Sequence, residues 1–327
     1  MGTELLTVKE LNVGFVNKGQ TIPVLSDVEF TVKKGETLCI VGESGCGKSL
    51  TSLSIMGLIP KNGEIMKGEI LFKGEDLVKK TKKEISQIRG KQISMIFQEP
   101  MTSLNPVHTV GKQIAESVRL HEGVGKKQAM EKAVEMLRLV GIPSPEKRVH
   151  DYPFEMSGGM RQRVMIAMAL VCNPNLLIAD EPTTALDVTT QAQILGLMGR
   201  LKKELDMSIV MITHDLGVVS QIADRVIVMY AGKVIEVSET MDLIENPKHP
   251  YTRGLIESIP KLHEEQDDLP TIKGSVPGLN EMPKGCRFST RCLYARQTCH
   301  EVEPTLTGEG QHKVSCWLHS PKWENLE

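Results

Sequence analysis

A glycine-rich stretch near the start of the chain has the residues and spacing of a phosphate-binding loop. Residues 42–49 read GESGCGKS, which fits G-x-x-x-x-G-K-[ST]. The glycines let backbone N–H groups approach a phosphate, and the start of the next helix adds a positive dipole end. We expect Lys48 to reach the β- and γ-phosphates and Ser49 to bind Mg²⁺. The residues predicted to contact the nucleotide are Gly42, Glu43, Ser44, Gly45, Cys46, Gly47, Lys48, Ser49 and Leu50.

Two adjacent carboxylates end an apolar run at residues 176–182, LLIADEP. A buried parallel strand delivers Asp180 at its carboxyl end, where open α/β sheets place ligands. We expect Asp180 to hold Mg²⁺ directly or through water. The side chain of Glu181, the next residue, projects in a different direction from that of Asp180. Glu181 is a candidate for polarising the water that attacks the γ-phosphate.

A second helix start suited to anions occurs at residues 156–163, MSGGMRQR. Ser157 is the expected N-cap, followed by two glycines in the first turn. Backbone N–H groups and the serine hydroxyl are then available to a phosphate.

The surrounding pattern predicts an α/β fold. The apolar run 37–41 leads into the glycine-rich loop, and a helix is expected from about Gly47 to Gly57. Apolar runs at 175–180 and 208–213 flank a helical stretch at 189–205, which predicts parallel strands with a crossover helix. Residues 225–237 predict a hairpin around Ala231 and Gly232, and a helical block spans about 100–172.

Composition restricts the class of protein. The 327 residues include 41 acidic and 39 basic ones, a net charge of −2, which argues against binding nucleic acid through bulk charge. The N-terminus has no basic and apolar leader, and the longest apolar run, 164–171, is far shorter than the ~20 residues of a membrane span. We therefore expect a cytoplasmic chain.

In combination, these motifs resemble the nucleotide-binding subunit of an ABC transporter. Ser157, Gly158 and Gly159 match the signature LSGGQ, although Met156 and Met160 depart from it. Further matches are Gln98 as the Q-loop, TALD (184–187) as the D-loop, His214 as the switch histidine, and Phe15 near the aromatic residue that stacks on adenine.

The resemblance implies how these residues work. Mg-ATP lies in a head-to-tail dimer, where the partner's signature helix closes over the nucleotide. Glu181 and His214 are the implied catalytic pair, and Gln98 acts with them and reports to the helical block. The implied Mg²⁺ ligands are Ser49, Gln98 and Asp180.

The stretches 98–114, 157–170 and 246–262 resemble more closely the dipeptide and oligopeptide importers, in particular the first of their two paired ATPase subunits. Two transmembrane permeases, a homologous ATPase and an extracellular peptide-binding protein are the implied partners, at the cytoplasmic face of the membrane. Pairing with itself stays open. A nickel importer subunit, a soluble non-transport ABC ATPase and a metal-centred regulator are the alternative functions.

Four of the seven cysteines lie near the end of the chain with spacing C-x5-C-x6-C-x16-C, at Cys286, Cys292, Cys299 and Cys316. The C-x2–4-C pairs that zinc sites favour are absent. Four thiolates can hold a [4Fe–4S] cluster, and the resembling importers carry one in this extension. Zn²⁺ and unmetallated thiols are the alternatives, and His300 and His312 are candidate replacement ligands. Cys46 is expected to have a pKa lowered by the helix N-terminus.

The predicted architecture is therefore an α/β P-loop domain of the ABC type over residues 1–245. It combines a mixed sheet with the helical block, here called the helical subdomain. A cysteine-rich extension with a four-cysteine metal site follows at 246–327.

Overall fold

The computed structural model describes residues 3–98, 103–184, 186–259, 271–320 and 323. The chain forms two compact units. The first unit consists mainly of Lys79–Ile212 with Lys33–Glu36, and the second of Glu4–Val32, Thr37–Val78 and Thr213–Glu327. The expected domain boundary at 245/246 falls inside the second unit and stays a prediction.

The first unit contains three parallel strands in the order β8-β7-β6. These strands are β6 (Ile93–Ile96), β7 (Leu176–Asp180) and β8 (Ser208–Thr213). Every residue of β7 and β8 is buried, which explains their uninterrupted apolar sequence. Helix α8 (Val188–Glu204) connects the two, so the predicted crossover arrangement is confirmed.

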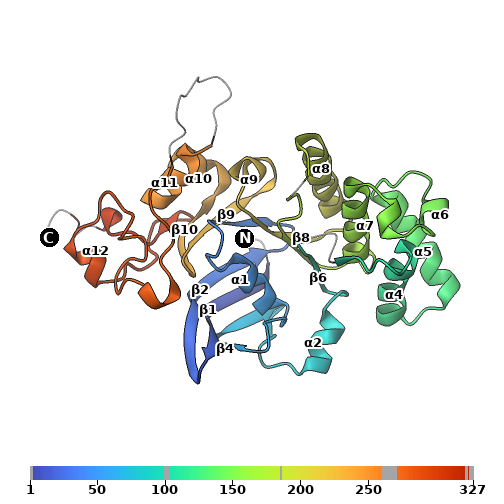
Figure 1. Cartoon of the computed structure of the whole chain (residues 1–327), viewed down its shortest axis with the longest axis horizontal. Helices are drawn as coiled ribbons and strands as arrows, with labels where there is room; N and C mark the ends of the chain where they lie inside the picture. The colour runs from blue at the N-terminus through green and yellow to red at the C-terminus, as the bar shows by residue number, and fades with distance from the viewer. Residues whose placement is uncertain (1–2, 99–102, 185, 260–270, 321–322, 324–327) are drawn as a thin grey trace. The chain divides into compact units, whose positions relative to one another are not determined.

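The helical subdomain of the first unit is built from α4 (Val110–Glu122), α5 (Lys126–Leu139), α6 (Pro145–Arg148), the 3₁₀ turn η1 (Pro153–Glu155) and α7 (Gly158–Leu170). Figure 1 shows α4, α5, α6 and α7 gathered together. Helix α5 buries Ala129, Ala133, Met136 and Leu137, the three- and four-residue spacing of one helix face. Helices are therefore confirmed in this block from residue 110, while residues 100–102 lie outside the described chain.

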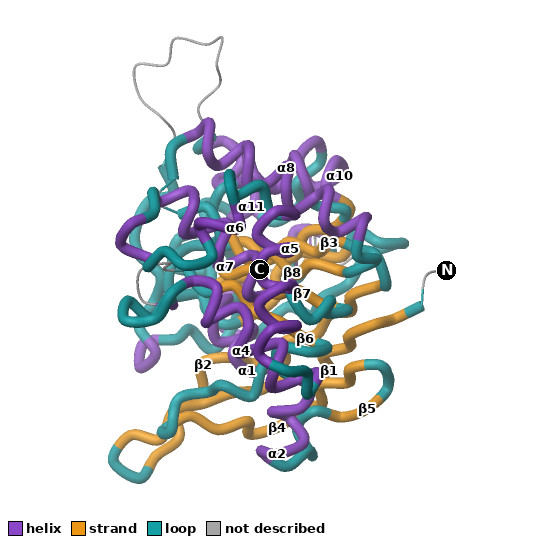
Figure 2. Tube along the Cα trace, turned by 90° about the vertical axis from the view of Figure 1, so that its right-hand side faces the viewer, coloured by secondary structure: helices purple, strands orange, loops and turns teal. Residues whose placement is uncertain are grey.

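The second unit contains a four-stranded sheet in the order β2-β1-β4-β5 (Figure 2). Its strands are β1 (Glu4–Asn17), β2 (Gln20–Lys33), β4 (Gly63–Phe72) and β5 (Glu75–Asp76), and β4 pairs antiparallel with both β1 and β5. The sequence predicted strands before residue 41, but it predicted no element between 58 and 98. Helix α2 (Lys82–Ile88), in the first unit, and β6 also lie in that interval.

A mixed set of strands in the order β11-β10-β9-β3 completes the strands of the second unit. Strand β3 (Thr37–Val41) is parallel to β9 (Arg225–Tyr230), which forms the predicted hairpin with β10 (Lys233–Glu239). At the hairpin turn Ala231 has φ 45° and Gly232 φ 83°. A Cβ on Gly232 would lie 1.8 Å from the carbonyl oxygen of Val24, so only glycine fits there.

The cysteine-rich extension begins after α10 (Thr240–Glu245) and includes α11 (Pro250–Glu257), the turns η2 (Leu279–Glu281) and η3 (Trp317–His319), α12 (Gln297–Glu301) and β11 (Lys313–Val314). Helices α1 (Lys48–Ile55) and α9 (Leu216–Ile222) also belong to the second unit. Across the described parts of the chain, no helix combines the length and apolar character needed to cross a membrane.

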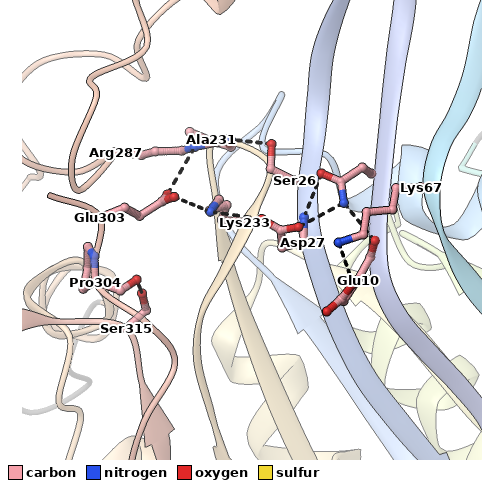
Figure 3. A network of polar contacts seen from close by, with 11 residues as sticks. Glu10, Ser26, Asp27, Lys67, Ala231, Lys233, Arg287, Glu303, Pro304 and Ser315 are labelled. Carbon is pink, nitrogen blue, oxygen red and sulfur yellow. Dashed lines mark hydrogen bonds and ion pairs between the residues drawn. The ribbon is translucent and has the colours of Figure 1, made fainter.

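Polar contacts attach the extension to the four-stranded sheet (Figure 3). Arg287 donates to the carbonyl oxygen of Ala231 and, over 2.7 Å, to Ser26 Oγ. Lys233 Nζ lies 2.6 Å from Glu303 Oε2 and 3.7 Å from Asp27 Oδ2. The extension therefore packs on the same unit that carries the glycine-rich loop.

Candidate functional site

The glycine-rich loop leaves buried strand β3 and turns directly into α1, as predicted. Gly42 has φ 152°, and a Cβ there would lie 2.2 Å from the carbonyl oxygen of Met229. Gly47, the N-cap of α1, has φ 99°, a conformation that side chains disfavour. Two glycines of the motif are therefore required by the loop's own shape.

Lys48 is almost fully buried, with 6% of its surface exposed. Its Nζ donates to the carbonyl oxygens of Gly42, at 2.7 Å, and Glu43, at 3.0 Å. The ammonium group therefore lies across the loop that a phosphate would enter. By contrast Ser44, Gly45 and Ser49 are exposed, whereas Leu50, in the first turn of α1, is buried.

Cys46 contradicts the expectation of a reactive thiol. It is fully buried, and burial raises its pKa above the usual value, although Lys48 acts in the opposite direction. The predicted lowering by the helix N-terminus is wrong because desolvation disfavours the thiolate more than the local positive charge favours it.

Two further predicted residues lie in the second unit. Phe15 is on β1, opposite Gly63 of β4, and is partly exposed, as a base-stacking ring must be. His214 is exposed directly after β8. It precedes Asp215, whose side chain caps α9 by accepting from the N–H groups of Gly217 and Val218.

The carboxylate pair lies at the end of β7 in the first unit. Asp180 is the last strand residue and is 6% exposed. Glu181 has φ 47°, an unusual backbone conformation for a residue other than glycine. Its Oε2 accepts from Gln98 Nε2 and from Thr184 Oγ1, each over 2.9 Å. Thr184 was not singled out from the sequence, although the TALD motif begins with it.

The signature segment is a capped helix start. Ser157 Oγ accepts from the N–H of Met160 over 3.3 Å, so the predicted N-cap of α7 is confirmed. Ser157 and Gly158 are exposed, Gly159 is partly so, and Met156 is buried. Gln162, which sequence reasoning missed, is buried one turn into α7 and donates to the carbonyl oxygen of Pro182. That bond connects the signature helix to the segment just beyond Glu181.

The segment predicted as the D-loop is partly described, since Ala185 lies outside the described residues. Asp187 caps α8 by accepting from the N–H of Thr190 over 2.9 Å. Hydrogen bonds from Thr190 lower the pKa of Asp187 below its usual value.

The four late cysteines line one cavity in the second unit, together with His249, Phe288 and Ser289. As the side chains stand, the described residues contain no group of three or more His, Cys, Asp or Glu close enough to hold a metal ion. Burial raises the pKa of Cys286 to about 11 and that of Cys316 to about 12. Neighbouring thiols add to both shifts.

The histidines near this cavity differ from the expectation. His300 is exposed on α12, and His312 lies 2.7 Å from Glu236 and 2.6 Å from Asp242. Neither lines the cavity, so neither is placed to replace a cysteine ligand. His249 does line it, and burial lowers the pKa of His249 to about 3.

The predicted residues divide between the two units. The first unit carries Gln98, Ser157, Gly158, Gly159, Asp180 and Glu181; the second carries Phe15, the loop 42–50, His214 and the four cysteines. Direct hydrogen bonds join Gln98 to Glu181 and Lys48 to its own loop.

Comparisons with known proteins find matches both to the region with the nucleotide motifs and to the C-terminal extension. A family model described as "ABC transporter" matches residues 25–184, and one described as "Oligopeptide/dipeptide transporter, C-terminal region" matches 235–299. The oligopeptide transport ATP-binding protein OppD of Bacillus subtilis is 53% identical over 99% of this chain and 92% of its own length. The dipeptide transport ATP-binding protein DppD of the same organism is 50% identical over 98% and 97%.

A solved structure extends the comparison to the fold. The ATP-binding cassette MJ0796, in a dimeric post-hydrolysis state bound to ADP and phosphate, is 28% identical with a TM-score of 0.64. The match covers 72% of this chain and 98% of that one.

Proposed function

Because this chain belongs to the ABC transporter family of ATP-binding subunits and carries the oligopeptide/dipeptide C-terminal region, we propose that it hydrolyses ATP to drive peptide import. One observation supports peptides as the transported substrate. Similarity to peptide transport ATP-binding proteins runs through almost the whole chain, extension included, at 50 to 53% identity. The proposed partners are two transmembrane permeases, a homologous ATPase subunit and an extracellular peptide-binding protein, with the chain at the cytoplasmic membrane face.

Glu181 is the proposed general base for water attack. Two donors, Gln98 Nε2 and Thr184 Oγ1, orient its carboxylate at 2.9 Å each. An oriented carboxylate can accept the proton of an attacking water as that water's oxygen bonds to phosphorus. His214 is proposed to assist at the γ-phosphate, and Gln98 to report the state of the site to the helical subdomain.

The nucleotide is proposed to lie on the glycine-rich loop. Lys48 would exchange its bonds to the carbonyls of Gly42 and Glu43 for phosphate oxygens, since both bonds lie inside the loop. Phe15 would stack on the base. Ser49, Gln98 and Asp180 are the proposed Mg²⁺ ligands, because their side chains carry the hard oxygen donors that Mg²⁺ prefers.

A head-to-tail dimer is the proposed working form, with a homologous ATPase as the other subunit. Support comes from the signature segment, where Ser157 and Gly158 are exposed at the start of α7. Their hydroxyl and N–H groups are thereby accessible to nucleotide held by another subunit. The similar cassette MJ0796 is itself described as dimeric.

The cysteine cavity is the proposed site of a [4Fe–4S] cluster, with Zn²⁺ as the alternative. Both bind cysteine thiolates, and four thiols line this cavity. His249 Nδ1 accepts from the N–H of Tyr251, so Nε2 carries the ring proton. Nε2 of His249 and Oγ of Ser289 are buried without a hydrogen-bond partner among the described residues. Orphaned donors in a thiol-lined cavity suit a bound group with sulfur acceptors. Such a group would cross-link residues 286–316 and stabilise the extension.

Anaerobic purification with analysis of iron, sulfide and zinc tests the metal proposal. We expect about four irons and four sulfides per chain with visible absorption, as four-cysteine ligation of one [4Fe–4S] cluster requires. Cys299→Ser should lower the iron content, whereas Cys172→Ser, outside the cavity, should not. A colourless protein with one zinc would establish the alternative, and metal-free protein would overturn both.

Reconstitution with the permeases and the paired ATPase in proteoliposomes tests the function. Peptide-loaded binding protein should stimulate ATP hydrolysis and peptide accumulation. Stimulation by a nickel-loaded binding protein alone would identify a nickel importer. ATP hydrolysis that never depends on permeases would overturn a role in transport.

A further inference from the structure

Glu43, the second residue of the glycine-rich loop, is bound by an arginine of the extension. Arg291 Nη1 donates to Glu43 Oε2 over 2.7 Å, and Nη2 donates to Oε1 over 3.0 Å. This two-bond geometry matches the planar guanidinium to the carboxylate and orients both groups. The Arg291 side chain is 4% exposed and that of Glu43 29%, so the ion pair is largely shielded from water.

The same glutamate is held through its backbone by a tyrosine from the start of α11. Glu43 N–H donates to the hydroxyl of Tyr251 over 2.8 Å, and Tyr251 is fully buried. His249 fixes the beginning of that helix by accepting from the N–H of Tyr251 over 3.0 Å. Residues 249–251, which read HPY, therefore support the loop.

Arg291 is itself held in position from several sides. Its Nε and Nη2 donate to the carbonyl oxygens of Lys273 and Ile272, over 3.0 and 3.1 Å. The guanidinium carbon lies 5.7 Å from the ring centroid of Tyr230 and 5.8 Å from that of Phe288. An arginine constrained in this way can orient Glu43 with little further loss of side-chain entropy.

Glu43 connects these contacts from the extension to Lys48, the lysine expected to bind phosphate. Its carbonyl oxygen accepts from Lys48 Nζ, while its N–H and its carboxylate are held by Tyr251 and Arg291. When Lys48 turns to a phosphate, the two contacts from the extension remain to keep the loop in shape. A loop already held in its binding geometry loses less entropy on binding, which raises its affinity.

We propose that Arg291 and Tyr251 are positioning residues for the phosphate-binding loop, through which the extension sets the affinity for nucleotide. This inference rests on the proposed ATP-binding role of the loop. It does not require any metal in the cysteine cavity.

Titration of the full-length chain with a fluorescent ATP analogue tests this proposal. Arg291→Gln and Tyr251→Phe should each raise the Kd about tenfold, the effect of losing a charged or buried hydrogen bond. The turnover number at saturating ATP should stay within about twofold, because ground-state affinity and not the chemical step is affected. The Glu43→Gln/Arg291→Gln double variant should match the Arg291→Gln single variant, because both changes remove one interaction.

Arg296→Gln is the matched control. Arg296 lies in the same extension, where its side chain donates to the carbonyl oxygen of Trp323 and lies over the Trp323 ring, so the Kd of Arg296→Gln should equal that of the parent. Additive effects in the double variant, or an Arg291→Gln Kd equal to that of Arg296→Gln, would overturn the proposal. If Arg291→Gln fails to fold, Glu43→Gln alone decides by the same measure. A parent chain that binds no nucleotide, with Lys48→Ala no different, would instead refute the proposed function.

Discussion

Gln98 Nε2 lies 2.9 Å from Glu181 Oε2, although the two residues are 83 positions apart in the chain. Parallel pairing of β6 with β7 produces this contact, since Ile96 pairs with Ala179 at the same offset. Continuing that register beyond the strand ends sets Gln98 opposite Glu181. The register of two buried strands therefore places the Q-loop amide on the proposed general base.

Glu181→Gln should retain ATP binding but lower turnover on the order of 100-fold, because the amide cannot accept the proton of the attacking water. Equilibrium binding of ATP and steady-state phosphate release measure the two effects. Glu204→Gln at the exposed end of α8 is the control and should hydrolyse ATP at the parental rate. Near-parental turnover by Glu181→Gln would remove Glu181 from the catalytic role.

Substitutions of Ser157 should separate helix capping from phosphate recognition. Ser157→Ala removes the cap of α7 and should cost about 1 kcal/mol of unfolding free energy. Ser157→Asn and Ser157→Asp keep a capping oxygen, so both should unfold like the parent. Only Asp adds a negative charge where a γ-phosphate is proposed to bind, and it should abolish ATP-dependent dimerisation, measured by size-exclusion chromatography. Equal dimerisation of the Asn and Asp variants would argue against phosphate at this helix start.

Cys46 should resist alkylation in the native chain at neutral pH. Its pKa is raised by burial, so the reactive thiolate forms only above the usual titration range of a thiol. Mass spectrometry after iodoacetamide treatment should show Cys46 unmodified with and without ATP, and modified after denaturation. Rapid native labelling that ATP prevents would indicate that the loop exposes the thiol.

Removing His312 should loosen the attachment of the extension. His312 lies between Glu236, which is fully buried, and Asp242, and its loss leaves the Glu236 carboxylate without a side-chain partner among the described residues. His312→Ala should lower the free energy of unfolding by about 2 kcal/mol in urea titrations, as for losing a buried hydrogen bond to a carboxylate that keeps its two backbone donors, Lys248 N–H and His249 N–H. The exposed His300→Ala is the control and should unfold like the parent, and equal stability of the two variants would contradict this role.

The contact with His312 should also appear in acid unfolding. A hydrogen bond with His312 lowers the pKa of Asp242 below the usual aspartate value of 3.8. A lowered carboxylate pKa contributes stability that is present above pH 3.8 and is lost as pH falls through the lowered value. Asp242→Asn should therefore be less stable than the parent at neutral pH and should lose less stability on acidification. Parallel pH profiles of the two proteins would contradict the assignment.

The motifs were predictable from the sequence because each is local. The loop 42–49, the cap at Ser157 and the buried strand before Asp180 depend on glycine conformation, N-capping and apolar runs over a few residues. The structure confirms these as elements, with β3, α1, β7 and α8 within a residue or two of the expected ranges and α7 beginning directly after the expected cap. The elements within residues 58–98 were not predicted, because strands β4 and β6 depend on pairing with β1 and β7, which lie far away in the sequence.

Sequence alone thus predicted the kind of chemistry, through residue types at fixed short spacings: glycines with Lys48 for a phosphate, carboxylates for a metal ion and a water, and four clustered thiols. Tertiary structure decided which distant groups meet. It paired Gln98 with Glu181, bound Glu43 to Arg291 and Tyr251, and turned His312 toward two carboxylates instead of the cysteines. It also buried Cys46, reversing the expected direction of its pKa shift. Strand register, packing and desolvation act between residues far apart in the chain, so local sequence patterns do not predict their effects.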